Sequence, residues 1–259
     1  MSSKDRESQI LRKLRHRGDV SLDQLTEDLG VSPASIRRDL ARLEMKGLVR
    51  RTPGGATVVE TLLYEPFRYD SVFQKRVRHQ AAEKRRIGLA AAELIQENET
   101  VGFTAGTTTT EAARGIRNRH NIRVITNAVN IAMELCNCEG LQTLVTGGFV
   151  QWAGSFSLVG HAAVEFVKEI YMDRVFVSVC GIDVARGITL IEPEESSTFR
   201  AMIQQAKQAI VLADSSKLGV VAPALICPVS QIHMLITDTN ATSPAIAPLQ
   251  ERGVEVRCV

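Results

Sequence analysis

The spacing of hydrophobic residues between 31 and 59 changes from a helical period to a strand-like one. The apolar positions of the first part are Ile36, Leu40 and Leu43. Their intervals of four and three residues predict a helix with one apolar face. Ser32 is a favourable residue to cap its start, and Gly47 is typical of a helix end. Two short strands are expected over 48–51 and 56–59, joined by a Pro-Gly-Gly turn.

Two shorter helices are predicted before this one, over 4–17 and 22–29. Ser21 and Gln24 have the spacing of a capping box, and Gly30 separates the second helix from the third. Three helices followed by a hairpin form a winged helix-turn-helix. Its third helix fits the major groove of DNA, and its hairpin can lie on the phosphates.

Polar and basic residues lie on the outer side of the third helix and on the hairpin. The predicted DNA-contacting residues are Ser32, Ser35, Arg37, Arg38, Arg42, Arg50 and Arg51. We expect the first four to reach base edges and nearby phosphates, and the last three to hold mainly phosphates. A small helical bundle that binds another protein would explain the leucines but not the arginines.

The rest of the chain divides into a linker, 59–86, and a larger domain, 87–259; the DNA-binding domain is 1–58. The linker carries aromatic residues and a basic run, which we interpret as a solvated helix face, with extra phosphate contacts as the alternative. From residue 87 onward, short apolar strands alternate with helices. This order predicts a Rossmann-like α/β domain with a mostly parallel sheet.

Polar segments, several of them containing glycine, follow one predicted strand after another. In an open parallel sheet these segments meet along one edge, where ligands bind. The segment 104–110 is rich in threonine and contains Gly106, which lets backbone approach a ligand before a helix begins, as suits a phosphate. Lys217 follows another strand and can neutralise an anion. One such loop alone is ordinary turn chemistry, whereas the set favours a small anionic ligand.

Charge is distributed unevenly along the 259 residues, although the net charge is only +2. Residues 1–57 contain 12 Lys and Arg against 8 Asp and Glu, a net +4, and the remainder is −2. Basic charge is therefore concentrated on the predicted DNA-binding domain. The 5 cysteines lack the spacing of a zinc site, so no metal and no cofactor is expected. The charged N-terminus is not a signal peptide and no segment reads as a membrane span, which favours a cytoplasmic protein.

The N-terminal motifs resemble those of the DeoR family of bacterial transcription regulators. The matching segments are Val31-Ser32, Ile36-Arg37-Arg38-Asp39-Leu40, Gly47-Leu48 and Arg50-Arg51-Thr52-Pro53-Gly54-Gly55-Ala56. The C-terminal part resembles the family's sugar-phosphate-sensing domain, which is related in fold to ribose-5-phosphate isomerase and glucosamine-6-phosphate deaminase. Its matching segments are Ala105-Gly106-Thr107-Thr108-Thr109, Thr126-Asn127, Gly147-Gly148, Gly181-Ile182-Asp183, Gly187-Ile188-Thr189 and Asp214-Ser215-Ser216-Lys217.

This resemblance implies a ligand site. The residues expected to hold the phosphate are Gly106, Thr107, Thr108 and Thr109, and those expected to line the sugar are Asn127, Gly147, Gly148, Asp183 and Lys217. Thr104 stands where many members carry Asp, which removes an acceptor for sugar hydroxyls and bears on which sugar phosphate binds.

The sequence therefore predicts a DNA-binding transcription regulator, a repressor of carbohydrate-metabolism genes that a phosphorylated sugar releases from its operator. The alternative is a sugar-phosphate isomerase or deaminase with an appended DNA-binding module. Its acid-base candidates are Asp183, Glu194, Glu195 and His161, but their spacing does not mark a catalytic pair, so no enzyme activity is expected. Because one winged helix reads only a few base pairs, we expect a homo-oligomer, at least a dimer.

Overall fold

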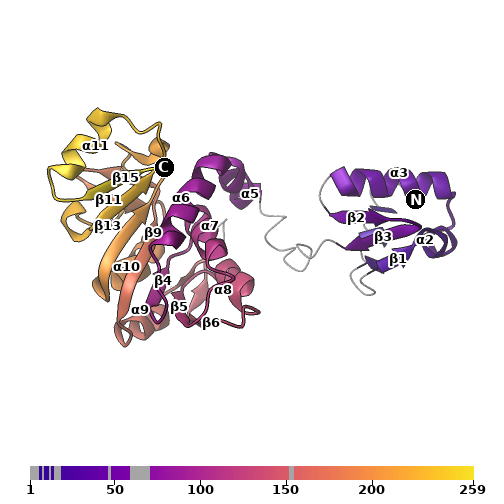
Figure 1. The fold of residues 1–259 in the computed structure, drawn as a ribbon, viewed down its shortest axis with the longest axis horizontal. Coiled ribbons are helices and arrows are strands. Elements are labelled where there is room, and N and C mark those ends of the chain that lie inside the picture. The colour runs from indigo at the N-terminus through magenta and orange to yellow at the C-terminus, as the bar shows by residue number, and fades with distance from the viewer. Residues whose placement is uncertain are drawn as a thin grey trace. The chain divides into compact units, whose positions relative to one another are not determined.

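The computed structural model describes residues 6–7, 9–11, 13–14, 19–45, 48–58, 71–151 and 155–259. The chain divides into two compact units, Met1–Tyr69 and Asp70–Val259 (Figure 1). The predicted linker differs from this division, because residues 71–86 form helix α5 (Ser71–Arg78) and the start of helix α6 (Ala81–Glu93) within the second unit. Phe73 explains the difference: it is buried and packs edge-on against Phe156, with ring centroids 5.1 Å apart. The remainder of the predicted linker, 59–70, lies outside the described residues.

The first unit is a winged helix-turn-helix. Residues 6–7, 9–11 and 13–14 are helical, and they are followed by β1 (Asp19–Ser21), α2 (Leu22–Leu29), α3 (Pro33–Met45), β2 (Val49–Thr52) and β3 (Gly55–Val58). The three strands form an antiparallel sheet in the order β1-β3-β2. Its core contains the apolar residues that the helical spacing singled out, Ile36, Leu40 and Leu43, together with Leu25 and Val49. The predicted end of α3 at Gly47 lies outside the described residues.

Local sequence sets both ends of α2. Ser21 caps α2 with a complete capping box, since its side chain accepts from the Gln24 amide and the Gln24 side chain accepts from the Ser21 amide. Gly30 ends α2 in the left-handed conformation, with φ of 61°, which glycine adopts without steric penalty. Gly30 confirms the predicted turn between α2 and α3, and the capping box at Ser21 confirms the predicted start of α2.

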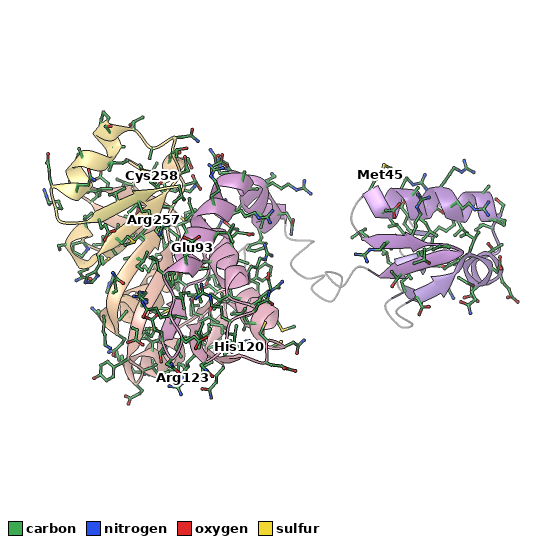
Figure 2. All side chains as sticks on the ribbon, viewed as in Figure 1. Met45, Glu93, His120, Arg123, Arg257 and Cys258 are labelled. Carbon is green, nitrogen blue, oxygen red and sulfur yellow. The ribbon has the colours of Figure 1, made fainter. Side chains whose placement is uncertain are left out.

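The second unit is built on a seven-stranded parallel sheet in the order β15-β14-β12-β9-β4-β5-β6. The strands are β4 (Thr100–Phe103), β5 (Ile122–Thr126), β6 (Leu141–Val145), β9 (Met172–Ser178), β12 (Ala206–Leu212), β14 (Met234–Thr237) and β15 (Glu255–Cys258). The helices between them are α7 (Thr107–Gly115), α8 (Val129–Leu135), α9 (His161–Lys168), α10 (Pro193–Gln204) and α11 (Ser243–Gln250). This order of strands and helices confirms the predicted α/β domain with a parallel sheet. An ion pair of 3.1 Å joins Arg257 of β15 to Glu93 of α6 (Figure 2).

Two small antiparallel sheets accompany the large one and were not predicted. One pairs β7 (Phe149–Val150) with β8 (Leu158–Val159), and the other has the order β10-β11-β13, over Gly181–Asp183, Gly187–Leu190 and Ala224–Cys227. Short 3₁₀ helices follow at Ser215–Lys217 and Val229–Gln231. These elements lie after strands of the main sheet; the sequence predicted polar segments for part of them and no element for the rest.

The chain reverses its direction of winding between the neighbouring strands β4 and β9. The chain runs from β4 through β5 to β6 on one side, and from β9 through β12 and β14 to β15 on the other. Phe103 and Phe176 stack at this junction, with centroids 5.3 Å apart, so the centre of the sheet is firmly packed. Such a reversal leaves a crevice at the carboxyl ends of the two strands, which is where ligands bind in open α/β sheets.

Candidate functional sites

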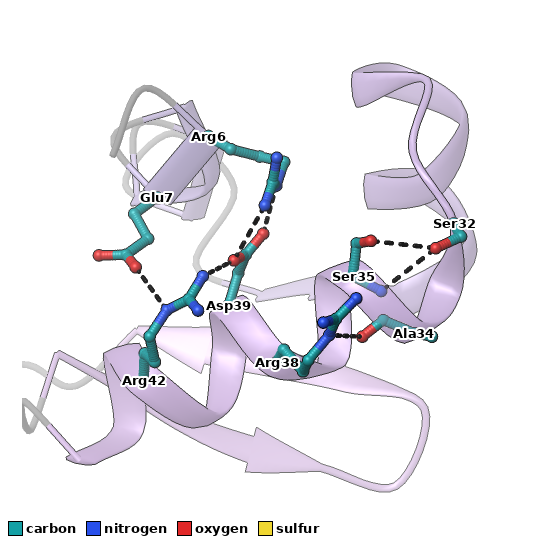
Figure 3. A network of polar contacts seen from close by, with 8 residues as sticks. All are labelled: Arg6, Glu7, Ser32, Ala34, Ser35, Arg38, Asp39 and Arg42. Carbon is teal, nitrogen blue, oxygen red and sulfur yellow. Dashed lines mark hydrogen bonds and ion pairs between the residues drawn. The ribbon is translucent and has the colours of Figure 1, made fainter. Parts of the chain in front are cut away.

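Helix α3 presents a polar face at its start. The Ser35 amide donates to Ser32 Oγ at 3.3 Å, which confirms Ser32 as the capping residue, and the two hydroxyls lie 3.0 Å apart (Figure 3). Arg37 and Arg38 are exposed on the side of the helix away from the buried Ile36. Arg38 makes only a long bond, 3.4 Å, from its Nε to the Ala34 carbonyl. This end of α3 therefore carries hydroxyl and guanidinium donors toward solvent, as a helix that reads DNA requires.

A buried carboxylate holds the middle of α3. Asp39 is fully buried and accepts hydrogen bonds from the guanidinium groups of Arg6 and Arg42 (Figure 3). Arg42 Nε also donates to Glu7 Oε1 at 2.9 Å. The hydrogen bond to Asp39 raises the pKa of Arg6. This network connects α3 with the N-terminal helical residues, so Arg42, which we predicted as a phosphate contact, has a positioning role within the unit.

The hairpin is tied to α3 in a similar way. Glu44 accepts from the Arg51 amide at 3.0 Å and from Arg51 Nε at 2.6 Å, and these bonds lower the pKa of Glu44. Both arginines of the hairpin, Arg50 and Arg51, are exposed. They differ because the guanidinium of Arg51 is paired with Glu44. Both arginines are evident in the sequence, but the pairing of Arg51 with Glu44 is not.

A cavity of about 200 Å³ lies at the carboxyl ends of β4, β9 and β12 in the second unit. Its polar lining comes from four parts of the chain, namely α5 with the residue after it, α6, the start of α7 and the segment after β12. These polar residues include Lys75, Arg76, His79, Lys84, Thr107, Thr108, Asp214 and Lys217. Ser178 and Cys180, from the end of β9, lie between them. The cavity is therefore at the reversal point of the sheet, and its lining combines these cationic and hydroxyl groups with the apolar residues Val179, Leu212 and Ala213.

The loop before α7 is shaped to bring a helix N-terminus to this cavity. Gly106 precedes the helix, and a Cβ there would lie 2.2 Å from Ser178 Cβ, so only glycine fits against β9. The hydroxyl of Thr109 donates to the carbonyls of Thr104 and Gly106, at 2.7 and 3.0 Å. Thr107 and Thr108 line the cavity. The threonines of the predicted hydroxyl loop therefore have two roles: Thr109 holds the loop, and Thr107 and Thr108 face the cavity.

Lys84 is the main residue that the sequence analysis missed. It is 6% exposed, and its ammonium donates to the carbonyls of Arg76 and of His79, the latter at 2.7 Å. Burial lowers its pKa to about 8. The interpretation of the basic run as a solvated face is therefore wrong for Lys84. A signal was present, since Lys84 is spaced three and four residues before Ile87 and Gly88, on the buried face of α6.

Lys217 is placed by the segment that follows β12. The buried Asp214 caps the short helix at Ser215–Lys217, since its Oδ1 accepts from the Ser216 amide at 3.2 Å. Asp238, at the end of the neighbouring β14, accepts from the Ser215 amide at 2.6 Å. Both carboxylates therefore fix backbone at the strand ends, and Lys217 reaches the cavity from that support.

The other predicted sugar-lining residues do not line this cavity. Asn127 is fully buried, where its Oδ1 accepts from the Ala105 amide at 2.9 Å and its Nδ2 donates to Ser157 Oγ at 2.8 Å. Asp183 Oδ1 accepts from two amides in the turn between β10 and β11. Gly147 and Gly148 have φ of 71° and 103°, in the turn after β6. In this structure these residues hold loops, and Asn127 in particular supports the segment that leads to Gly106.

The carboxylates and histidine considered for catalysis are dispersed. The side chain of His161 is 89% exposed and faces Glu165. Glu195 lies buried in α10, where burial raises its pKa. Across the described residues, no hydrogen bond or ion pair joins any two of Asp183, Glu194, Glu195 and His161. The described part of the chain also holds no group of three or more metal-ligating side chains, and no helix in it is long and apolar enough to cross a membrane.

Comparison with known proteins agrees with both units. Residues 6–62 match the DeoR-like helix-turn-helix domain and residues 79–239 match the DeoR C-terminal sensor domain. The chain belongs to the DeoR family and is a DNA-binding transcription regulator.

Individual relatives extend along nearly the whole chain. A protein of Escherichia coli O157:H7, named for transcriptional repression of an aga operon, is 34% identical over 97% of this chain and 92% of its own length. The glycerol-3-phosphate regulon repressor of Escherichia coli K12 is 29% identical over 99% of both chains. Among solved structures, the ribose 5-phosphate isomerase A of Methanocaldococcus jannaschii shares 18% identity over 53% of this chain and 54% of its own, with a TM-score of 0.39, a similarity too low to carry an argument.

Proposed function

We propose that this protein is a repressor whose second unit binds a phosphorylated sugar in the cavity at the reversal point of its sheet, and that the ligand releases operator DNA. The observation that carries the proposal is the cavity itself. It combines two threonines at the start of α7 with Lys84 and Lys217. A helix N-terminus with hydroxyl and ammonium donors is suited to a phosphate dianion. The names of the relatives, among them a glycerol-3-phosphate regulon repressor, support a phosphate ester and a repressor role.

The cavity suggests a division of roles. Thr107, Thr108 and the α7 amides bind the phosphate, and Lys84 and Lys217 neutralise its charge. The volume of about 200 Å³ is small for a ligand pocket and favours a single small sugar phosphate over a nucleotide.

The DNA-binding unit suggests its own division. Ser32, Ser35, Arg37 and Arg38 reach base edges and nearby phosphates from α3. Arg50 binds phosphate from the hairpin. Arg42 and Arg51, whose side chains are 40% and 51% exposed, add phosphate contacts at the edge of the interface. We further propose that the protein binds its operator as a homo-oligomer, because one winged helix reads too few base pairs for useful specificity.

Enzyme activity is not part of the proposal. An isomerase or deaminase needs a positioned acid-base pair beside the bound sugar. Asp214, a carboxylate in the cavity lining, already accepts hydrogen bonds from Ser216. An isotope-exchange assay with pentose and hexose phosphates tests this directly, and turnover of any of them would require an enzymatic function instead.

Thermal unfolding of the full chain against a panel of sugar phosphates, with the matching free sugars, tests the ligand. A ligand at a hundredfold excess over its Kd stabilises the folded state by about 2.7 kcal/mol. We expect a shift with one phosphate ester and none with its free sugar. Lys217→Met should abolish the shift, whereas Lys168→Met, which removes an exposed lysine of α9, should keep it. A shift that survives in Lys217→Met would place the ligand elsewhere.

Operator binding tests the other unit. DNA selected by the full chain from a random library supplies the probe. Arg38→Ala should weaken binding and reduce the slope of log K against log salt by about 1 if Arg38 contacts a phosphate, or relax the sequence preference if it contacts a base. Arg123→Ala, in the second unit, is the control. Unchanged affinity, slope and preference in Arg38→Ala would remove that residue from the interface.

A further inference from the structure

The side chain of Lys84 connects helix α5 with the proposed ligand cavity. The ammonium of Lys84 donates to the carbonyls of Arg76 and His79, at the C-terminal end of that helix. Carbonyls at a helix end have no partner within the helix, and a cation there also interacts favourably with the helix dipole. An ammonium has three donors, so two hold α5 and one remains. Since Lys84 lines the cavity, the remaining donor is placed to serve a ligand there.

The same helix forms one wall of the cavity. Lys75 and Arg76 of α5, and His79 after it, line the space that Thr107 and Thr108 line from α7. Figure 1 shows α5 beside α6 and α7. An anion bound at the start of α7 therefore lies between a helix N-terminus and the cationic end of α5, and attracts both.

The position of α5 in the chain gives this contact a further consequence. The second unit starts at Asp70 and α5 starts at Ser71, so α5 is the first element of the sensor after the DNA-binding unit. A ligand that stabilises the packing of α5 therefore acts on the segment of the second unit that directly follows the first unit in the chain.

We propose that an anionic ligand clamps α5 against α7 through Lys84, and that α5 is the element through which occupancy of the cavity acts on the DNA-binding unit. This inference rests on the proposed function of the cavity. Without a ligand, the charged form of Lys84 is disfavoured first by burial and then by repulsion from Lys217 and Arg76, while Asp214 and Glu111 favour it. A phosphate offsets that repulsion and favours the protonated lysine. The protonated form is the one that donates to α5 and to the ligand together.

Hydrogen exchange on the full chain, with inorganic phosphate as the probe and sodium chloride at equal ionic strength as the reference, tests the clamp. At phosphate ten times its Kd, amides of 107–110 and of 72–79 should both exchange up to about tenfold more slowly. Slower exchange at 107–110 with no change at 72–79 would overturn the clamp and leave the proposed site standing. No change in either segment would contradict both.

Lys84→Met tests the residue itself, because methionine keeps the apolar stem and removes all three donors. Compared at the same multiple of its own Kd, this variant should exchange faster than wild type at 72–79 and show no slowing there with phosphate. Arg85→Met, an exposed position on the same helix, should behave as wild type. Protection of 72–79 by phosphate in Lys84→Met would overturn the role of Lys84. Complete loss of phosphate binding would support its contact with the anion, and the wild-type comparison of the two segments then decides the clamp.

Discussion

Gly106 offers a sharp test of how the start of α7 is held at the cavity. Its φ of 160° is nearly extended backbone, which any residue adopts, so replacing it introduces no backbone strain. The obstacle is steric. A Cβ at this position would lie 2.2 Å from Ser178 Cβ and 2.3 Å from Ser178 Oγ, whereas carbon atoms in contact lie about 3.5–4.0 Å apart. Gly106→Ala must therefore move α7 away from β9 by an appreciable fraction of that difference.

The expected size of the effect follows from this overlap. Forcing an extra methyl group into a packed core typically costs about 1–3 kcal/mol. A loss of about 2 kcal/mol corresponds to a Tm lower by roughly 4–8 °C for a unit of this size. Because Thr107 and Thr108 move with the helix, Gly106→Ala should also lose the thermal shift that phosphate or a phosphate ester produces in the wild type.

A second substitution separates this cause from a general defect. Ser178→Gly removes the two atoms that a Cβ would overlap most and leaves Thr109 Oγ1 at 3.1 Å, so Gly106→Ala with Ser178→Gly should recover most of the Tm, less the roughly 0.5–1 kcal/mol that glycine costs within a strand. Ser178→Ala removes only Oγ and keeps Cβ, so it should not rescue. Calorimetry of the four proteins in the presence and absence of phosphate measures both effects. Equal rescue by glycine and alanine, or a Gly106→Ala protein as stable as wild type, would refute the reasoning.

Three further predictions concern other parts of the molecule. Asp39→Ala should destabilise the first unit by about 3 kcal/mol, because hydrogen bonds to charged groups contribute about 1.5–3 kcal/mol each. Glu44→Ala removes an exposed ion pair and should cost clearly less. Hydrogen exchange of α3 amides measures both, and equal effects would contradict a structural role for the buried carboxylate. Burial raises the pKa of Cys227 to about 12, so Cys227 should be alkylated only after unfolding. The exposed Cys136 should be alkylated in the folded protein. Mass spectrometry of labelled peptides measures both, and early labelling of Cys227 would count against its burial. Folding lowers the pKa of Lys84 from 10.5 to about 8, so between those pH values the unfolded chain binds more protons on this residue. The stability of wild type relative to Lys84→Met should therefore rise with pH through that range. A Tm difference between the two proteins that is independent of pH would show that the lysine is not buried as described.

Local patterns predicted the helices and hairpin of the first unit and the parallel sheet of the second, but not β1 or the two small antiparallel sheets. The spacing of Ile36, Leu40 and Leu43 reports one buried helix face, and the capping box at Ser21 and the left-handed Gly30 are signals within a few residues. The alternation of strands and helices likewise predicted the parallel sheet. The segment 104–110 was identified for the same reason, because a threonine-rich loop between a strand and a helix is visible without knowing what packs on it.

Partners from distant elements could not be predicted in this way. Arg42 and Arg51 look like Arg37 and Arg50 in the sequence, and their roles diverge only because carboxylates lie beside them in the fold. Asn127 has the position of a ligand-binding residue, but it is occupied by Ala105 and Ser157. Each of these outcomes depends on side chains that meet across the tertiary structure.

The sequence by itself determined the two domain types, the cap and core of the DNA-reading helix and the loop that begins α7, because these follow from periodicity and turn chemistry over short distances. Only the tertiary structure decided which cations lie at the cavity. In the sequence, Lys84 is one charge in a basic run. In the fold, the end of α5 lies beside α6, and two of its carbonyls accept hydrogen bonds from the Lys84 ammonium. A buried charge is retained only where hydrogen bonds replace its hydration, and that compensation comes from residues that the linear sequence does not bring together.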